Sequence, residues 1–179
     1  MKCAHWFRVV LLGSALLGLP ACQMLGPHGE SRLVFPEPGP AWRTHVGQLR
    51  YVTPERSVIG ETVVSRDGAS DFQLDFMTGP GVPLMRLREE GRTVLAEGLF
   101  ARGRWEGRPG RAGRLSGWVA LREVFAALDG PGSRPREARS PEGSPVLWSA
   151  RAEYSGQRLE RLEARFPRTR ERFIFVFPR

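Results

Sequence analysis

The sequence predicts a mainly β fold with some α-helix, in which a curved antiparallel sheet forms an incomplete barrel covered by one or more helices. Short strand-like segments separated by turn signals run from residue 48 to the end of the chain, and one amphipathic helix interrupts them at residues 117–128. The bulky apolar side chains also exceed what one helix covers, which is typical of a strongly curved sheet with an aromatic interior. The length of 179 residues suits a single compact domain.

The first five strands are expected to form a meander. Residues 71–76 predict a strand most clearly, because Phe72, Leu74 and Phe76 alternate with polar residues, as in a strand with one dry and one wet face. The other four strands are bounded by turn signals rich in Gly, Pro and Asp, and they are expected at residues 48–53, 58–65, 82–88 and 93–99.

The second half of the domain contains the helix and three further strands. Residues 101–116 are rich in Gly and Arg and predict an irregular segment, and Ser116 is the candidate cap of the helix that follows. Residues 131–145 predict a polar surface excursion. The last strands are expected at residues 146–154, 158–166 and 171–177. The middle one also fits a helix, but Gly156 and Pro167 leave room for only a short element, which favours a strand.

The first 22 residues resemble a lipoprotein signal. Lys2 and Arg8 precede the apolar run of residues 9–19, which is too short to span a bilayer and is followed by Leu19-Pro20-Ala21-Cys22. This ending is similar to the lipobox of bacterial lipoproteins and implies cleavage before an acylated Cys22. Ordinary export with an unmodified cysteine is the alternative. We therefore expect three parts: a signal peptide at residues 1–21, a lipidated Pro/Gly-rich tether at 22–41 and one domain at 42–179.

Residues suited to catalysis or to metal binding are scarce. Cys3 and His5 lie in the signal peptide, Cys22 is assigned to lipid and His28 lies in the tether, so only His45 belongs to the domain. A Ser-His-Asp hydrolase and a His-rich zinc site are therefore nearly excluded. The sequence predicts that the protein is not an enzyme, with no catalytic residue, no metal and no cofactor.

The formal net charge of +8 leaves several partners open. Basic residues attract nucleic acid, but here Arg and Glu are interspersed, and an exported protein meets anionic phospholipid head groups more often than DNA. A solvated arginine-rich surface without a partner is an equally good interpretation. We expect no nucleic-acid partner and a monomer.

The apolar residues that point into a curved sheet are candidates to line a lipid cavity. An ordinary packed core is the alternative for each of them. The candidates are Phe72, Leu74, Phe76, Leu95, Trp118, Leu121, Phe125, Trp148, Phe173, Phe175 and Phe177.

A resemblance to a known family is carried by four segments, residues 70–88, 116–122, 158–166 and 173–177. The first resembles a hairpin, the second the later helix, and the last two the closing strands of the LolB-like outer-membrane lipoprotein receptors, which belong to the LolA/LolB lipoprotein-localisation superfamily. The resemblance implies an incomplete antiparallel β-barrel under a helical lid. It also implies that the apolar interior accepts acyl chains of lipoproteins from a periplasmic carrier protein.

The same resemblance implies a membrane-contact loop at residues 79–83, where Val82 is the apolar residue that touches the membrane. Gln23, in place of Asp after Cys22, implies release to the outer membrane, with the protein facing the periplasm. Two alternatives remain open. The protein is either a carrier or binder of another lipid on the same fold, or a structural envelope lipoprotein without a ligand.

Overall fold

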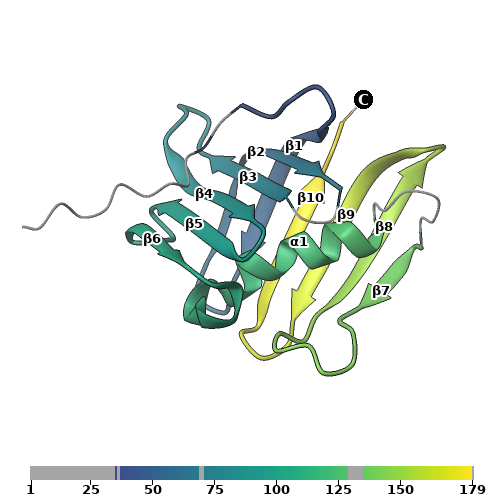
Figure 1. Ribbon diagram of the computed structural model, residues 1–179. Coiled ribbons are helices and arrows are strands. Elements are labelled where there is room, and N and C mark those ends of the chain that lie inside the picture. Colours follow the sequence, from purple (N-terminus) through teal and green to yellow (C-terminus); the bar gives the residue numbers. More distant parts are fainter. Residues whose placement is uncertain (1–34, 36, 69–70, 129–134, 179) are drawn as a thin grey trace, which may run out of the picture. The chain divides into compact units, whose positions relative to one another are not determined.

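The structure, a computed structural model, describes residues 35, 37–68, 71–128 and 135–178 (Figure 1). These residues form ten strands, one α-helix and two short 3-10 turns. In chain order the elements are β1 (Arg43–Val52), β2 (Ser57–Asp67), β3 (Asp71–Met77), β4 (Pro83–Glu90), β5 (Thr93–Gly98), β6 (Gly103–Gly107), η1 (Pro109–Arg111), η2 (Gly113–Leu115), α1 (Ser116–Leu128), β7 (Glu137–Arg139), β8 (Ser149–Ser155), β9 (Arg158–Phe166) and β10 (Glu171–Val176).

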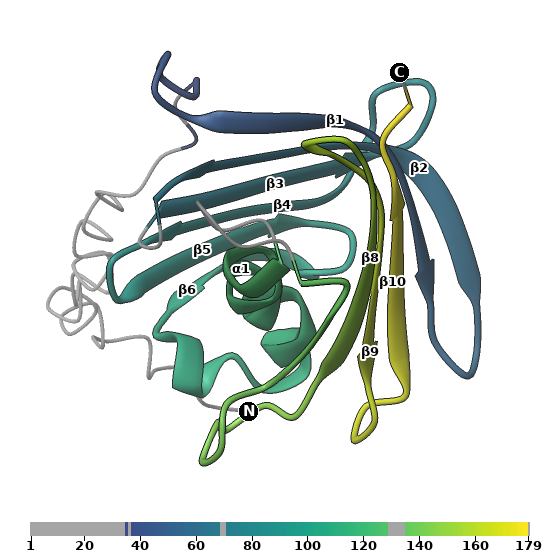
Figure 2. The same cartoon turned by 90° about the vertical axis from the view of Figure 1, so that its right-hand side faces the viewer.

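All ten strands belong to one antiparallel sheet with the order β6-β5-β4-β3-β2-β1-β10-β9-β8-β7. Two meanders, β1–β6 and β7–β10, are joined where β1 pairs with β10, from Gln48 opposite Val176 to Val52 opposite Arg172. The sheet curves strongly, so that β8, β9 and β10 stand across the direction of β3, β4 and β5 (Figure 2). Within the described residues β6 and β7 do not pair with each other, so the sheet is open. The predicted curved antiparallel sheet is confirmed.

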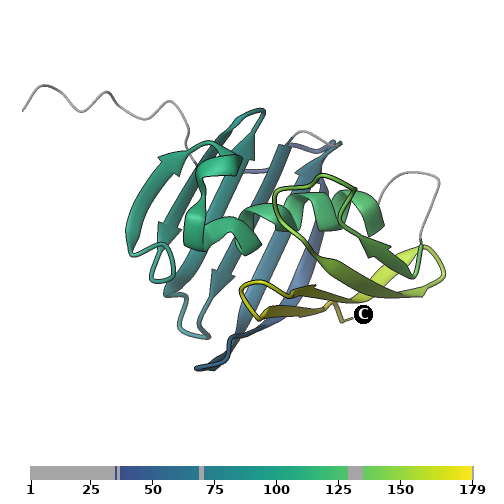
Figure 3. The same ribbon diagram turned by 90° about the horizontal axis from the view of Figure 1, so that it is seen from below.

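α1 lies on the concave face of the sheet and crosses its strands (Figure 3). Trp118, Leu121, Phe125 and Leu128 recur every three or four residues, which places them on one buried stripe. The helix predicted at residues 117–128 is confirmed. The predicted role of Ser116 is wrong, because Ser116 has helical dihedrals (φ −57°, ψ −37°) and continues directly from η2. A 3-10 turn, rather than a capping side chain, begins the helix.

Two segments that the sequence assigned to irregular structure contain short edge strands. Residues 101–116 include β6, which pairs with β5 and places Trp105 opposite Ala96. Residues 131–145 include β7, which pairs with β8, while residues 131–134 lie outside the described part. Both strands are rich in residues with low β-propensity, so pairing with a formed neighbour determines them. The segment 158–166 is the strand β9, and its helical alternative is wrong.

The convex face is covered in one region, although β3 was expected to have a wet face. Gln73 and Arg88 are paired across β3 and β4 on this face, and both are buried. The ring of Trp42 lies 4.5 Å from the Arg88 guanidinium, and Phe35 lies 4.7 Å from that of Arg86. Phe35 in the predicted tether and Trp42 at the start of the predicted domain therefore pack on the sheet and withdraw part of the polar face of β3 from solvent.

Candidate lipid-binding site

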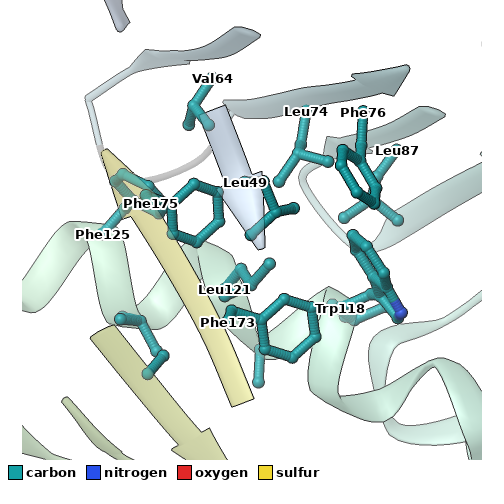
Figure 4. Packing of buried hydrophobic residues seen from close by; sticks show 14 of the residues in the cluster. Leu49, Val64, Leu74, Phe76, Leu87, Trp118, Leu121, Phe125, Phe173 and Phe175 are labelled. Atoms are coloured by element: carbon teal, nitrogen blue, oxygen red, sulfur yellow. The ribbon is translucent and has the colours of Figure 1, made fainter. Parts of the chain in front are cut away.

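Ten of the eleven predicted cavity residues lie in one buried cluster on the concave face (Figure 4). This cluster includes Leu121, and partly buried hydrophobic residues pack against it. Eight of the ten come from β3, β10 and α1, which confirms that the alternating residues of β3 and the stripe of α1 face each other, while Trp148 directly precedes β8 and Phe177 directly follows β10. The ten are Phe72, Leu74, Phe76, Trp118, Leu121, Phe125, Trp148, Phe173, Phe175 and Phe177.

Leu95 is the exception, and its prediction as a cavity residue is wrong. Leu95 is opposite Arg88 in the β4–β5 ladder, and Arg88 is opposite Gln73 in the β3–β4 ladder. Residues opposite each other in an antiparallel ladder share a face. Leu95 is therefore buried on the convex face, with Gln73 and Arg88, while its neighbours Val94 and Ala96 belong to the concave cluster.

Side chains of α1 fill the middle of the concave face. The Trp118 ring lies 4.8 Å from Phe173 and 6.0 Å from Phe76, measured between centroids. The Phe125 ring lies 5.2 Å from Phe175 and 5.9 Å from Phe72. These are ordinary aromatic packing distances. At these positions the residues form a packed core between helix and sheet, which was the alternative interpretation for each of them.

The amino-terminal end of α1 packs against a buried carboxylate. The Tyr51 hydroxyl donates to Glu171 Oε1 at 2.6 Å, and the Thr169 hydroxyl donates to Glu171 Oε2 at 2.7 Å. Burial raises the pKa of Tyr51 well above its ordinary value, and the hydrogen bond to Glu171 raises it further. A Cβ atom on Gly117 would collide with Glu171 Oε2, so a larger residue here would have to displace this carboxylate from its two hydrogen bonds.

The carboxyl-terminal half of α1 is linked to both wings of the sheet by polar groups. Arg122 Nε lies 2.8 Å from Glu89 Oε1 on β4, and the Trp148 indole donates to Glu123 at 3.4 Å. The Tyr154 hydroxyl donates to the Leu128 carbonyl. These contacts place α1 between β4 on one side and the β8 region on the other.

Glu89 is the most unusual titratable group on the concave face. Its side chain is fully buried, and neither carboxylate oxygen accepts an aligned hydrogen bond from a described residue. Burial raises the pKa of Glu89 from 4.5 to about 7, the Arg122 guanidinium offsets part of this rise, and the nearby Glu123 adds to it. The sequence gives no signal for the burial of Glu89, because it lies in a charged stretch of strand, Arg88-Glu89-Glu90.

A hollow of about 560 Å³ opens where the sheet is interrupted, beyond the carboxyl end of β10. β1 pairs with β2 along its whole length but with β10 only from Gln48 onward. Residues 43–47 therefore face a gap, which the β8–β9 hairpin borders on the other side. The lining residues are Arg43, Thr44, His45, Val46, Ser155, Gln157, Arg158, Leu159, Phe177 and Pro178.

The hollow borders the aromatic core at one point. The His45 ring lies 5.1 Å from Phe177 and 6.3 Å from Phe125. Of the predicted cavity residues, Phe177 alone lines the hollow. Sequence reasoning missed the others, although His45 had been identified as the one histidine of the domain. Pro178 was an available signal, since proline cannot donate to a ladder and ends a strand.

The predicted membrane-contact loop is an exposed turn between β3 and β4. Val82 is 57% exposed. The turn is closed by hydrogen bonds from Gly81 N to the Thr78 carbonyl and from Val82 N to Thr78 Oγ1. Its geometry presents Val82 to solvent. Cys22, the predicted lipidation site, lies outside the described residues.

A scan of the chain against models of protein families finds no match, and a search of curated proteins finds none either. Within the described residues, no group of three or more His, Cys, Asp or Glu side chains is placed to hold a metal ion. None of the helices described here has both the length and the apolar character needed to cross a membrane.

Proposed function

We propose that this protein is a lipid-anchored outer-membrane lipoprotein that faces the periplasm and binds an acyl chain in the hollow beside His45. The observation that carries the proposal is the interruption of the sheet between β1 and β9, which leaves a solvent-accessible hollow next to a buried aromatic cluster. The volume of about 560 Å³ lies within the range of small-molecule sites.

The lining of the hollow suits a molecule with an apolar chain and an acidic or ester head group. Leu159 and Phe177 are buried apolar residues at its base. Arg43 and Arg158 stand at its border, and the exposed Arg158 guanidinium is also 3.1 Å from Glu160. An apolar base with a few polar groups at the border is the usual composition of a ligand site.

The curved sheet with a helix on its concave face supports the resemblance to the LolA/LolB superfamily as a half-barrel under a lid. On this proposal the natural cargo is the acyl part of a lipoprotein, handed over by a periplasmic carrier protein and inserted into the membrane. A carrier of another lipid would use the same hollow.

Lipid anchoring rests on the sequence Leu19-Pro20-Ala21-Cys22 at the end of an apolar run. Intact mass spectrometry of the mature protein tests it. We expect cleavage after Ala21 and a triacylated Cys22, since two or more chains anchor stably where one does not. A mature protein with an unmodified thiol, or with another amino terminus, would contradict the proposal.

Binding in the hollow is tested with cis-parinaric acid, a fluorescent fatty acid, and with mass spectrometry of lipids that co-purify with the protein. Val46→Trp places an indole at the border of the hollow, and Ile59→Trp is the matched control away from it, because both residues lie on the convex face and are 65% and 62% exposed. We expect Val46→Trp to weaken binding at least tenfold, and Ile59→Trp to leave it unchanged.

A second candidate function is that of a structural envelope lipoprotein without a ligand. The filled middle of the concave face favours it, because Trp118 and Phe125 occupy the space that a bound chain would take in an empty half-barrel. Absence of saturable fatty-acid binding, together with absence of co-purified lipid, would select this candidate.

A further inference from the structure

One end of the sheet concentrates arginine residues on its turns. The turns that join β1–β2, β3–β4, β5–β6 and β9–β10 and the β7–β8 connection (residues 140–148) all lie at this end, because each links the same ends of antiparallel strands. We call the four turns (residues 53–56, 78–82, 99–102 and 167–170), together with residues 108–115, the turn rim. The turn rim contains seven arginines and one acidic residue, Glu55, and the β7–β8 connection adds one more acidic residue, Glu142. The connections β2–β3, β4–β5 and β8–β9, at the opposite end, contain one charged residue, Arg92.

Contacts join the segments of the turn rim other than the β3–β4 turn into one surface. Arg114 Nη2 donates to the Ala101 carbonyl at 2.6 Å, and the Arg56 guanidinium lies 4.8 Å from the Phe100 ring. Residues 109–113 and the β9–β10 turn border a common hollow. The positive charges of the separate turns are therefore held close to one another.

Most of the rim arginines are exposed and are not neutralised. Five of them form no ion pair with any residue that the structure describes, and all five are exposed. A guanidinium on a solvent-exposed turn is available to bind a phosphate with two parallel hydrogen bonds. The five are Arg102, Arg108, Arg111, Arg168 and Arg170.

Two of these arginines are held in an unfavourable backbone conformation. Arg102 and Arg170 have φ angles of 58° and 57°, and they are the non-glycine residues with positive φ in the described chain. Glycine adopts this conformation without a steric penalty, whereas an arginine there costs folding free energy. Strain of this kind collects at functional positions, which makes Arg102 and Arg170 candidates for a role beyond the turn itself.

Exposed apolar side chains lie beside the arginines. Val82 and Leu99, at the tips of two rim turns, are 57% and 64% exposed. A surface that mixes protruding apolar residues with unpaired arginines is suited to the head-group region of a membrane, where apolar groups insert and basic groups meet phosphate.

We propose that the turn rim docks on a bilayer containing anionic phospholipid, with the arginines bound to lipid phosphates and with Val82 and Leu99 inserted between head groups. This contact adds to the proposed lipid anchor and does not depend on what the hollow binds. Cys22 precedes Phe35 by 13 residues, which reach at most about 45 Å when extended. Three residues of β4, about 10 Å, separate Arg86, beneath Phe35, from the rim end of the strand. The anchor therefore leaves the rim free to meet the membrane.

The test uses the full chain with Cys22→Ala, so that no acyl anchor contributes. Binding is measured by co-sedimentation with phosphatidylcholine vesicles with and without phosphatidylglycerol, and the ratio of the two partition coefficients is compared between variants. The ratio cancels any contribution of the amino-terminal apolar segment, which is common to all variants. The rim variant is Arg102→Gly/Arg170→Gly, and the control is Arg92→Gly/Arg136→Gly, which removes the same charge from exposed residues away from the rim.

Each basic residue near an anionic surface is worth about fivefold in binding, so the rim variant should lower the ratio about 25-fold. The control should change it by less than about threefold, since removed charges beyond the Debye length are screened. The rim variant should also melt at the same or a higher temperature, because glycine relieves the strain. Equal losses in both variants, an unchanged ratio, or no preference of the parent chain for anionic vesicles would overturn the proposal.

Discussion

The two ends of α1 are held to the sheet in different ways. At the amino-terminal end, Gly117 contacts Glu171 with no room for a methyl group, and the ring of Trp118 packs against Tyr51 at 4.8 Å and Phe173 at 4.8 Å. At the carboxyl-terminal end, Phe125 neighbours His45, which borders the hollow. One end is fully packed, and the other adjoins open space.

The polar contacts of α1 with the sheet also differ between its two ends. The Glu171 carboxylate accepts hydrogen bonds from two hydroxyls, whereas burial raises the pKa of Glu89 although the Arg122 guanidinium lies 2.8 Å away. A carboxylate whose burial outweighs its ion pair costs free energy when it is ionised. The difference indicates that ligand binding and pH should act on the carboxyl-terminal end of α1, while the amino-terminal end stays in place.

Truncation of the two buried rings should give the largest effects. Replacing a buried Phe or Trp by Ala typically costs about 3–5 kcal/mol, and more where the site cannot relax. We expect Trp118→Ala to cost about 5 kcal/mol and Phe125→Ala about 3 kcal/mol, as measured by chemical denaturation. An unchanged stability in Phe125→Ala would contradict the packing of the helix on the sheet, and a larger loss than in Trp118→Ala would reverse the comparison.

The pH dependence of stability should follow Glu89. Its pKa is raised from 4.5 to about 7 by folding, so the folded state holds a proton that the unfolded state has released between these values. The free energy of unfolding should therefore fall as the pH rises from 4.5 to 7, by about 3 kcal/mol for the full shift. Glu89→Gln should flatten this slope.

The exposed neighbour Glu90 provides the control for this prediction, because Glu90→Gln should leave the slope as it is. Urea denaturation at a series of pH values measures both variants. A slope that survives in Glu89→Gln would assign the pH dependence to another group and would remove the proposed difference between the two ends of α1.

The sequence was sufficient to predict the elements in which side-chain pattern and local propensity agree. β3 alternates strictly, and α1 repeats its apolar residues at helical spacing, so both were predicted to within one residue at each end. β6 and β7 were missed because they are short edge strands whose residues favour no conformation until β5 and β8 offer partners.

The candidate site was predictable only in part, for a related reason. Burial of Phe72 or Phe125 follows from periodicity, but periodicity does not tell a filled core from an open cavity. The hollow depends on where β10 stops relative to β1, and this register is a property of two strands more than 100 residues apart in the chain. Leu95 was misplaced because β5 is buried on both faces, which removes the alternation that identifies an inward residue.

Two tyrosine hydroxyls offer a smaller and more direct comparison of the ends of α1. Tyr51 donates to the carboxylate of Glu171, and Tyr154 donates to the neutral carbonyl of Leu128. A buried hydrogen bond to a charged group is worth about 1.5–3 kcal/mol, and one between neutral groups about 1 kcal/mol. Tyr51→Phe should therefore cost about 2 kcal/mol and Tyr154→Phe about 1 kcal/mol in thermal or chemical denaturation. Equal losses would mean that the amino-terminal end is not held more firmly than the other.

The smallest effect on stability is expected from Val82→Glu, because Val82 takes no part in the packing of α1 on the sheet. Val82 is exposed on a turn that hydrogen bonds to Thr78 hold closed, and surface substitutions away from special features change stability by about 0.5 kcal/mol or less. The same change places a carboxylate where the proposed delivery of acyl chains needs an apolar residue at the membrane. Full burial of a Val side chain is worth roughly 1.5–3 kcal/mol, enough to assist a transient insertion and too little to anchor the protein.

We therefore expect Val82→Glu to have the same melting temperature as the parent protein and to bind cis-parinaric acid in the hollow with the same affinity. We expect it to transfer acyl cargo to vesicles more slowly. Val82→Leu, which keeps an apolar tip, serves as the control and should transfer at least as fast as the parent. Because the turn lies at the end of the sheet away from the hollow, a loss confined to transfer would separate the membrane contact from the binding site. Transfer at the parental rate in Val82→Glu would mean that the turn only connects β3 to β4, and the carrier or structural alternatives would then be favoured.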